Sequence, residues 1–188
     1  SPTFVNAIAK LAKEKDILIA VDEVQTGNGR TGTYFAYQQY GITPDIVTTA
    51  KGLGGGLPIG AVLFGEKLQD TMTPGSHGST FGGNPVVAAG ACSIVERIDD
   101  DFLSEVQRKS EKIRTALAKV KGVQSISGMG LMLGIETDKS AGEVAKACLA
   151  NGLLILTAKT KLRLLPALNI SDAELDEGLE ILKGVLEA

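Results

Sequence analysis

The sequence predicts an α/β segment followed by a smaller α+β module, and two features support this fold class. Short continuous apolar runs such as ILIAV at 17–21 lie between helical patterns, and strands that are apolar on both faces are typical of a parallel sheet covered by helices. After Gly122 the expected strands and helices become shorter. We therefore predict two domains, residues 1–105 and 106–188, joined in or near the helix around 101–121.

The first of these parts opens on a helical pattern. Its apolar residues share one helical face, at Phe4, Ile8, Leu11 and Ala12. Further on, a loop rich in Gly and Ser ends where Asn84 can cap a helix whose first residue is Pro85. In chain order we expect strands at 17–21, 46–49 and 59–65, a turn-rich loop at 24–33, and helices at 34–40 and from 85 to about 98.

The second part begins with a long amphipathic helix whose apolar residues recur at spacings of three, four and seven, and Gly122 is expected to end it. Two later helices each open with a predicted capping box, formed by Ser140 with Glu143 and by Ser171 with Glu174. The remaining expected elements are strands near 123–127, 130–136, 153–157 and 162–165, and helices near 141–150 and 172–187.

The composition excludes several classes of function. Among the 188 residues, 19 basic side chains face 22 acidic ones, so the chain has no broad positive field for nucleic acid or an anionic membrane. No apolar run approaches the length of a membrane span, and no zinc-ligand spacing or other metal motif is present. Cys92 and Cys148 lie far apart in helical patterns, which indicates a reduced, cytoplasmic protein with both thiols in its core.

Two charged residues follow neighbouring strands, where ligands gather in open α/β sheets. Asp22 directly follows the run at 17–21, and Lys51 follows the strand at 46–49 and precedes a cluster of glycines. A lysine in this place can form a Schiff base with a carbonyl cofactor, and the glycines would let that cofactor lie against the backbone. The alternatives are a helix cap or ion pair for Asp22 and a solvated loop position for Lys51.

Two phosphate-binding motifs are similar to these loops but differ from them in residue order or spacing. A phosphate loop requires the lysine to follow the glycines, whereas Lys51 precedes them. The stretch GNGRTG at 27–32 lacks the third glycine of a dinucleotide fingerprint and has a different spacing. The order of the residues therefore excludes the first motif and leaves only a loose resemblance to the second.

Three further polar groups are candidates for ligand contacts. Ser79 and Thr80 offer hydroxyls close to a helix start, which suits a phosphate, although a hydroxyl-capped turn explains them equally well. Arg163 stands among leucines, where its planar guanidinium could face a cleft and bind a carboxylate, or pair with a structural acid. We expect His77 to orient its loop and give it no catalytic role.

Four segments together resemble the class III (subgroup II) pyridoxal-phosphate aminotransferases, which have fold type I. These segments are IAVDEVQTGNGRTG, PDIVTTAKGLGGGLPIGA, HGSTFGGNP and LRLLPALNI, in that order, and the resemblance covers the whole chain. It implies that residues 1–105 are the C-terminal part of the large, cofactor-binding domain and that 106–188 are the small C-terminal domain. Within the family, the segments are most similar to the acetylornithine aminotransferases.

The resemblance implies a role for each residue of the cofactor segment. Lys51 would form a Schiff base with pyridoxal 5'-phosphate, and Asp22 would keep the pyridine nitrogen protonated. Val24 would pack on a face of the ring and Gln25 would reach its hydroxyl. Glu23 belongs to the same segment, with a less defined part in binding the cofactor.

The resemblance also implies a homodimer and a substrate site. Thr80 would hold the cofactor phosphate of the neighbouring subunit, Ser79 would lie beside the substrate there, and Arg163 would bind a substrate carboxylate. The implied activity moves an amino group from the terminal amine of N-acetylornithine, or a similar ω-amino donor, to 2-oxoglutarate in arginine biosynthesis.

Several alternatives to this activity stay open. The amino donor could instead be ornithine, 4-aminobutyrate or succinylornithine, or the chain could be a non-catalytic remnant that only folds, dimerises or binds a partner. The resemblance places a phosphate cup, a ring-stacking aromatic and a substrate arginine upstream of the matched residues. We therefore expect that the 188 residues alone do not transaminate and that their sheet leaves apolar surface uncovered.

Overall fold

The computed structural model describes residues 1–188 and divides them into two compact units. Unit 1 contains residues 1–29 and 33–102, and unit 2 contains residues 30–32 and 103–188. The boundary thus follows Phe102, inside a helix, whereas the sequence analysis places it after residue 105. No helix combines the length and the apolar character that crossing a membrane requires.

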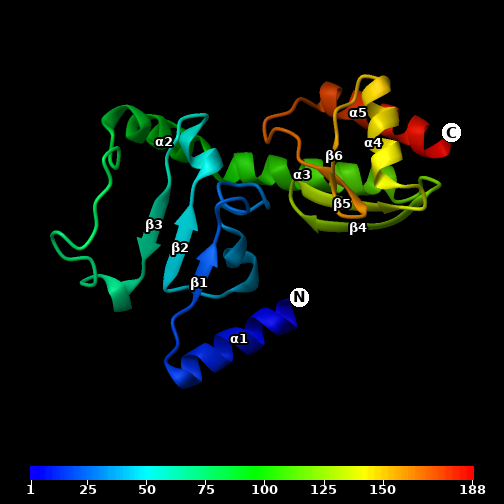
Figure 1. Ribbon diagram of the computed structural model, residues 1–188. Helices are drawn as coiled ribbons and strands as arrows, with labels where there is room; N and C mark the ends of the chain where they lie inside the picture. The colour runs from blue at the N-terminus through cyan, green and yellow to red at the C-terminus, as the bar shows by residue number, and fades with distance from the viewer. The chain divides into compact units, whose positions relative to one another are not determined.

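The sheet of unit 1 has the strand order β1-β2-β3 (Figure 1). Strand β1 (Ala20–Asp22) runs parallel to β2 (Ile46–Thr49), and β3 (Ala61–Phe64) runs antiparallel to β2. The mostly parallel sheet expected here therefore includes one antiparallel pairing. Its physical reason is the short connection of residues 50–60, because a parallel partner needs a longer crossover.

The first strand begins later than the apolar run predicts. The backbone amide of Ile17 donates to the carbonyl of Ala12 at the end of the first helix, and the amide of Ile19 donates to the Asp45 carboxylate at 2.8 Å. These bonds use the backbone donors that a strand ladder at 17–19 would need.

The helical elements of unit 1 are α1 (Pro2–Lys15), η1 (Ala36–Tyr40), η2 (Lys51–Gly54), η3 (Glu66–Leu68) and α2 (Pro85–Arg97).

The helix cap predicted for unit 1 is confirmed by a hydrogen bond. The Asn84 side chain accepts from the amide of Val86 at 3.0 Å, which confirms the predicted start of α2. Cys92 on this helix is exposed, and the prediction that it lies in the core is wrong. The reason is that α2 is apolar around most of its surface but buries only Ala91 fully.

Unit 1 leaves large apolar side chains in contact with solvent. On α1 these are Phe4, Ile8 and Leu11, and on β3 every residue is exposed, including Phe64 at 40%. The helical face predicted at the start of the chain therefore forms, but only Ala12 of that face is buried. The exposed strand agrees with the expectation that the sheet leaves apolar surface uncovered.

Unit 2 is built around a four-stranded antiparallel sheet of order β4-β5-β7-β6. It holds all ten of the largest fully buried side chains, among them Ile113 on α3, Leu133 on β5 and Leu182 on α5. The elements of this part are α3 (Asp100–Leu117), β4 (Val123–Met129), β5 (Met132–Thr137), α4 (Ala141–Ala150), β6 (Leu156–Ala158), β7 (Lys161–Leu164) and α5 (Asp172–Glu187).

One of the two predicted capping boxes is confirmed and the other is wrong. At α5 the Ser171 hydroxyl accepts from the amide of Glu174 while the Glu174 carboxylate accepts from the amide of Ser171. At α4, Ser140 occupies the N-cap position but its side chain makes no capping hydrogen bond. The preceding helix α3 ends at Leu117, earlier than Gly122, which instead supplies a left-handed turn residue with φ 93°.

Helices α3 and α5 are joined by a group of exposed ion pairs. Arg108 on α3 lies 2.9 Å from Glu105 and 2.7 Å from Asp172, and Lys112 lies 2.9 Å from Asp172 and 2.7 Å from Asp176. Hydrogen bonds from Arg108 and then Lys112 lower the pKa of Asp172 to about 2. Asp172 therefore connects the two cations at the start of α5.

The lowered pKa gives these pairs a predictable dependence on pH. A carboxylate whose pKa falls below its ordinary 3.8 on folding stabilises the folded state above about pH 4, and this stabilisation is lost as the pH falls toward about 2. We expect Asp172→Asn to lower the melting temperature slightly at pH 7 in low salt. The difference from the unmodified chain should shrink in high salt, and it should shrink again as the pH falls through about 2.

Glu177→Gln is the matched control for this prediction, because Glu177 is exposed on the same helix and forms no ion pair. Melting curves followed by circular dichroism at several pH values check it. An Asp172→Asn difference that persists unchanged at pH 2, or that Glu177→Gln reproduces, contradicts the assignment.

Candidate functional site

Asp22 is the last residue of β1 and pairs in register with Thr48 of β2. One oxygen of its carboxylate, Oδ1, accepts from the backbone amide of Val24 at 3.0 Å and from the Thr48 hydroxyl at 3.4 Å. These two bonds fix the carboxylate at the end of the strand. The other oxygen, Oδ2, has no partner within the chain, so it is free to accept a hydrogen bond from a ligand.

Lys51 begins the turn that follows β2, three residues beyond the partner of Asp22. Its backbone has φ 48°, in the left-handed region, which costs a residue with a Cβ about 1–2 kcal/mol. Strained backbone of this kind persists where the surrounding structure holds it, and it gathers at functional sites. The Lys51 side chain is exposed and its ammonium makes no hydrogen bond or ion pair. The amine is therefore available for chemistry.

The loop after Asp22 is organised by the buried carboxylate of Glu23. This side chain is only 3% exposed; its Oε1 accepts from the backbone amide of Tyr37 at 2.9 Å, and its Oε2 accepts from the Thr26 hydroxyl. Gly27 completes the turn, since a Cβ there would lie 2.8 Å from the Glu23 carbonyl oxygen. Both oxygens of Glu23 are thus used in shaping the loop, and its contact with a cofactor stays a prediction.

The same loop brings Asn28 under the turn that carries Lys51. The Asn28 amide nitrogen Nδ2 donates to the Thr49 hydroxyl and to the Ala50 carbonyl, each at 3.1 Å. Its oxygen Oδ1 is the only buried side-chain polar atom of the chain that has no hydrogen-bond partner. The sequence analysis missed Asn28, although an asparagine between two glycines is a signal for left-handed backbone.

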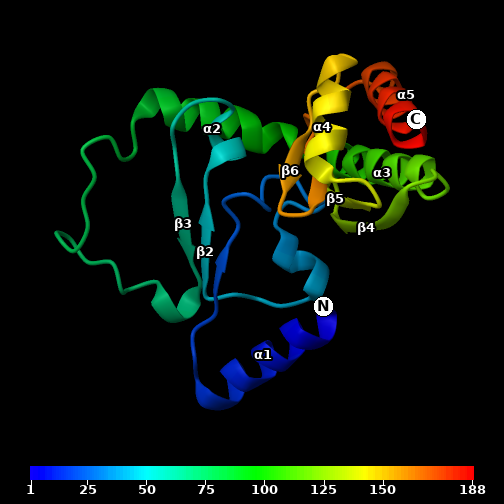
Figure 2. The same cartoon turned by 45° about the vertical axis from the view of Figure 1, so that its right-hand side comes forward.

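The other residues predicted for the cofactor segment lie in two places. Val24 is half-buried and Gln25 is exposed, and both belong to the turn that starts directly after Asp22. Ser79 and Thr80 lie in the segment between η3 and α2, which extends away from the sheet (Figure 2). Every residue from 69 to 86 is exposed, and neither hydroxyl forms a hydrogen bond with Lys51.

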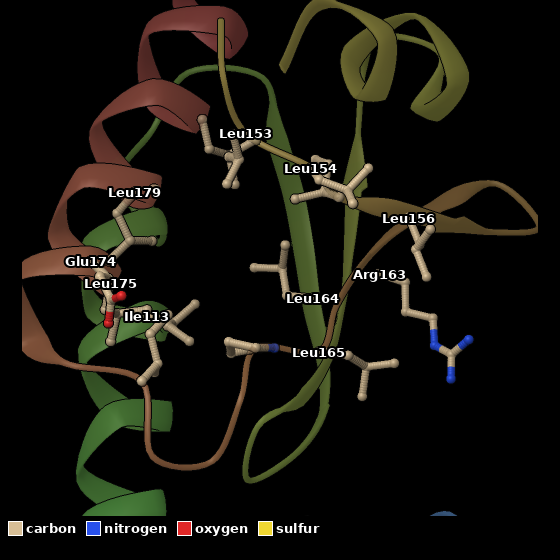
Figure 3. A pocket seen from close by; sticks show the side chains of 15 residues that line it. Ile113, Leu153, Leu154, Leu156, Arg163, Leu164, Leu165, Glu174, Leu175 and Leu179 are labelled. Carbon is tan, nitrogen blue, oxygen red and sulfur yellow. The ribbon is translucent and has the colours of Figure 1, made fainter. Parts of the chain in front are cut away.

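Arg163 belongs to unit 2, where it occupies β7 opposite Gly134 of β5 and Leu156 of β6. Beside it lies an apolar cavity of about 380 Å³, which α5 lines with Leu175 and Leu179. Figure 3 shows the Arg163 side chain extending away from these two leucines. The guanidinium makes no hydrogen bond or ion pair within the chain, so it is free to bind a carboxylate.

Arg30 is a second residue that the sequence analysis missed. Its guanidinium donates to the carbonyl of Leu131 at 3.1 Å and to that of Pro166 at 2.7 Å, and burial lowers its pKa. Gly130 allows this close approach, because a Cβ there would lie 2.4 Å from the backbone of Thr31. Arg30 thereby holds the segment that follows β7 in unit 2. Its position between glycines in a turn-rich loop was the only signal in the sequence.

Comparisons with known proteins agree on one family. The family model described as "Aminotransferase class-III" matches residues 1–186. An acetylornithine aminotransferase of Haemophilus ducreyi is 52% identical over 185 residues, which are 97% of this chain and 47% of the relative. The chain therefore spans about half the length of the curated relatives it matches.

Two solved structures extend the comparison to the fold. The N-acetylornithine aminotransferase of Stenotrophomonas maltophilia is 37% identical, with a TM-score of 0.86 over 97% of this chain and 50% of that one. The ornithine δ-aminotransferase of Plasmodium falciparum is 31% identical, with a TM-score of 0.87 over 100% of this chain and 51% of that one. These similarities confirm the predicted fold-type I architecture, and the chain belongs to the class-III aminotransferase family.

Proposed function

We propose that the protein is a pyridoxal-phosphate-dependent aminotransferase that takes the terminal amino group of N-acetylornithine and passes it to 2-oxoglutarate. The observation that carries this proposal is the pair formed by Asp22 and Lys51 at the ends of two paired parallel strands. The names of the relatives at 41–52% identity support the donor. A role in arginine biosynthesis and a cytoplasmic location follow from the same proposal.

The residues present fit pyridoxal phosphate. Lys51 supplies an amine without a partner, and Asp22 supplies a carboxylate oxygen without a partner. Glycines at 52 and 54–56 follow Lys51 closely, so these positions put no side chain between the turn and a ring. An amine, an acid and an open glycine turn are the groups that a carbonyl cofactor with a basic ring nitrogen requires.

When bound, pyridoxal phosphate supplies an electron sink for the negative charge that appears when a substrate amine loses its neighbouring proton. Lys51 has two tasks in this chemistry. Its amine attaches the cofactor covalently, and when free it takes and returns a proton as a general base and then a general acid. Both tasks need an amine that is not paired with a carboxylate. The Lys51 ammonium forms no ion pair in the structure.

Asp22 keeps the ring nitrogen protonated. Its Oδ1 is occupied by the amide of Val24 and the hydroxyl of Thr48, which orient the carboxylate, while Oδ2 is left for the ring N–H. A negative charge beside that nitrogen favours its protonated form. Val24 and Gln25, which follow Asp22 directly, are proposed to contact the ring face and its hydroxyl.

On the substrate side, Arg163 is proposed to bind a carboxylate of the amino or keto acid. Its guanidinium is half-buried and unpaired, and such a group binds carboxylates with two parallel hydrogen bonds. Ornithine is the second candidate donor, because an ornithine aminotransferase matches the fold with a TM-score of 0.87. The acetylated donor is favoured because curated relatives at 41–52% identity are named acetylornithine aminotransferases. Rates with both donors, measured on the intact protein, discriminate between them.

We also propose a homodimer in which Thr80 binds the cofactor phosphate of the neighbouring subunit and Ser79 lies beside its substrate. The support is the segment from 69 to 86, which is exposed throughout and extends from the sheet of its own unit (Figure 1). The large apolar side chain of Phe81, 82% exposed, lies next to Thr80. A second copy of the chain would cover it.

Replacing Lys51 tests whether it is the covalent anchor. Lys51→Ala in the intact protein should abolish transamination and the absorbance band that pyridoxal phosphate acquires on attachment, because no other amine stands at this strand end. Lys159→Ala is the matched control, since Lys159 is also exposed and left-handed, with φ 55°. Normal turnover by the Lys51→Ala variant refutes the proposal, and a silent spectrum of the unmodified protein favours a non-catalytic remnant.

Another prediction concerns Asp22. We expect Asp22→Asn to bind the cofactor but to slow proton removal by about 10²-fold or more, because an amide does not hold the ring nitrogen protonated. Single-turnover kinetics with the amino donor measure this step directly. Asp70→Asn, at an exposed aspartate without a partner, is the control. Equal single-turnover rates for Asp22→Asn and the unmodified protein rule out the proposed role.

A mixing experiment tests the shared site. If Thr80 acts across the dimer, a mixed dimer of Lys51→Ala and Thr80→Ala subunits combines both defects in one site and leaves the other site intact. Mixing the two inactive or weakened variants should therefore restore activity. No restoration is expected if Thr80 serves the site of its own subunit, and that result contradicts the proposal.

A further inference from the structure

We propose that Asn28 is a positioning residue for Lys51, holding the turn that presents the lysine amine to the cofactor aldehyde. The inference rests on the proposed function, because it assigns Asn28 to the same chemistry. Asn28 does not touch the reacting atoms. It acts through the backbone on either side of Lys51.

Asn28 faces residues on both sides of Lys51 in the sequence. Before the lysine, the amide nitrogen donates to the Thr49 hydroxyl and the Ala50 carbonyl, each at 3.1 Å. After the lysine, Gly52 faces this side chain, since a Cβ added to it would lie 3.4 Å from the Asn28 Cβ. One asparagine thus forms hydrogen bonds with the two residues that precede Lys51 and faces the one that follows it.

The carboxamide has only one orientation that satisfies the turn. The Ala50 carbonyl can only accept hydrogen bonds, so the group of Asn28 that faces it must be the NH₂. This carbonyl also accepts from the amide of Leu53 at 3.0 Å, which closes the turn η2. Both acceptor positions of one carbonyl are therefore used, directly before Lys51, and Asn28 supplies one of the two donors.

The unpaired side-chain oxygen of Asn28 supports a role for its carboxamide in the turn of Lys51. In this orientation Oδ1 is buried without a donor, while the side chain is only 4% exposed. A buried acceptor without a partner is unfavourable and uncommon in folded proteins. The same orientation lets the Asn28 NH₂ group donate to both residues that precede Lys51.

The backbone of Asn28 is as constrained as that of Lys51. It has φ 55°, a left-handed conformation that asparagine, aspartate and glycine adopt more readily than other residues. The loop that carries it is anchored at Glu23, whose amide donates to the Thr48 carbonyl at 2.9 Å. The segment that starts at Asp22 therefore returns to the Lys51 turn and fixes its shape.

Two substitutions separate the amide from the backbone conformation. Asn28→Asp keeps the shape and the left-handed backbone but puts a carboxylate oxygen against the Ala50 carbonyl, where no donor remains. Asn28→Gly keeps the backbone conformation and removes the carboxamide, and it serves as the test if the Asp variant does not fold. Asn151→Asp is the matched control, since Asn151 also donates to a backbone carbonyl, that of Ala147 at 2.9 Å, in unit 2.

The readout compares two forms of the cofactor in the intact protein. The Lys51 amine would attach to the aldehyde carbon of pyridoxal phosphate with loss of one water, whereas pyridoxamine phosphate has no aldehyde and would bind only non-covalently. Loss of the two hydrogen bonds should weaken apparent binding of pyridoxal phosphate about 10-fold in both Asn28 variants. Binding of pyridoxamine phosphate should stay unchanged, and Asn151→Asp should alter neither.

The outcomes separate this inference from the proposed function. Equal weakening of both cofactor forms means that Asn28 only maintains the pocket, and no weakening of either means that it has no role; each result overturns the inference. If the unmodified protein and Lys51→Ala bind pyridoxal phosphate equally well, the proposed function itself fails. A loss confined to the aldehyde form supports the positioning role.

Discussion

The parallel pairing of β1 with β2 is the constraint on which the candidate site depends. The register that aligns Asp22 with Thr48 sets the acid at the carboxyl end of one strand and, a few residues later, the lysine at the end of the next. The ladder continues past the strand, since the amide of Glu23 donates to the Thr48 carbonyl. A slip of one residue would turn the Asp22 side chain to the other face of the sheet.

The loop after Asp22 fixes the backbone around both charged residues of the candidate site. Glu23 holds the loop through its two carboxylate oxygens, and Asn28 at the other end of the loop holds the turn of Lys51. Unit 2 has a well-packed core around its own sheet, and Arg163 on its strand β7 makes no hydrogen bond or ion pair within the chain. Strand register and loop hydrogen bonds thus fix the positions of Asp22 and Lys51 in unit 1. The position of Arg163 is fixed by the sheet of unit 2, which packs around its own core.

How much the sequence could predict follows from the physics of each residue. Lys51 and Asp22 could be proposed from the sequence because their types and their places after apolar strands are visible in the chain. Asn28 and Arg30 were missed because their roles come from hydrogen bonds to carbonyls that only the folded loop brings near. The antiparallel β3 was missed because a continuous apolar run does not encode strand direction, although the short connection before it does limit the direction.

The central claim is that Lys51 is the covalent anchor of pyridoxal phosphate, and peptide mapping after borohydride reduction tests it most directly. Reduction makes the bond between an amine and the cofactor permanent, so mass spectrometry of the digested intact protein identifies the lysine that carries it. The account predicts that the cofactor mass lies on the peptide that contains Lys51 and on no other. A label on a different lysine, or none after saturation with the cofactor, would contradict it.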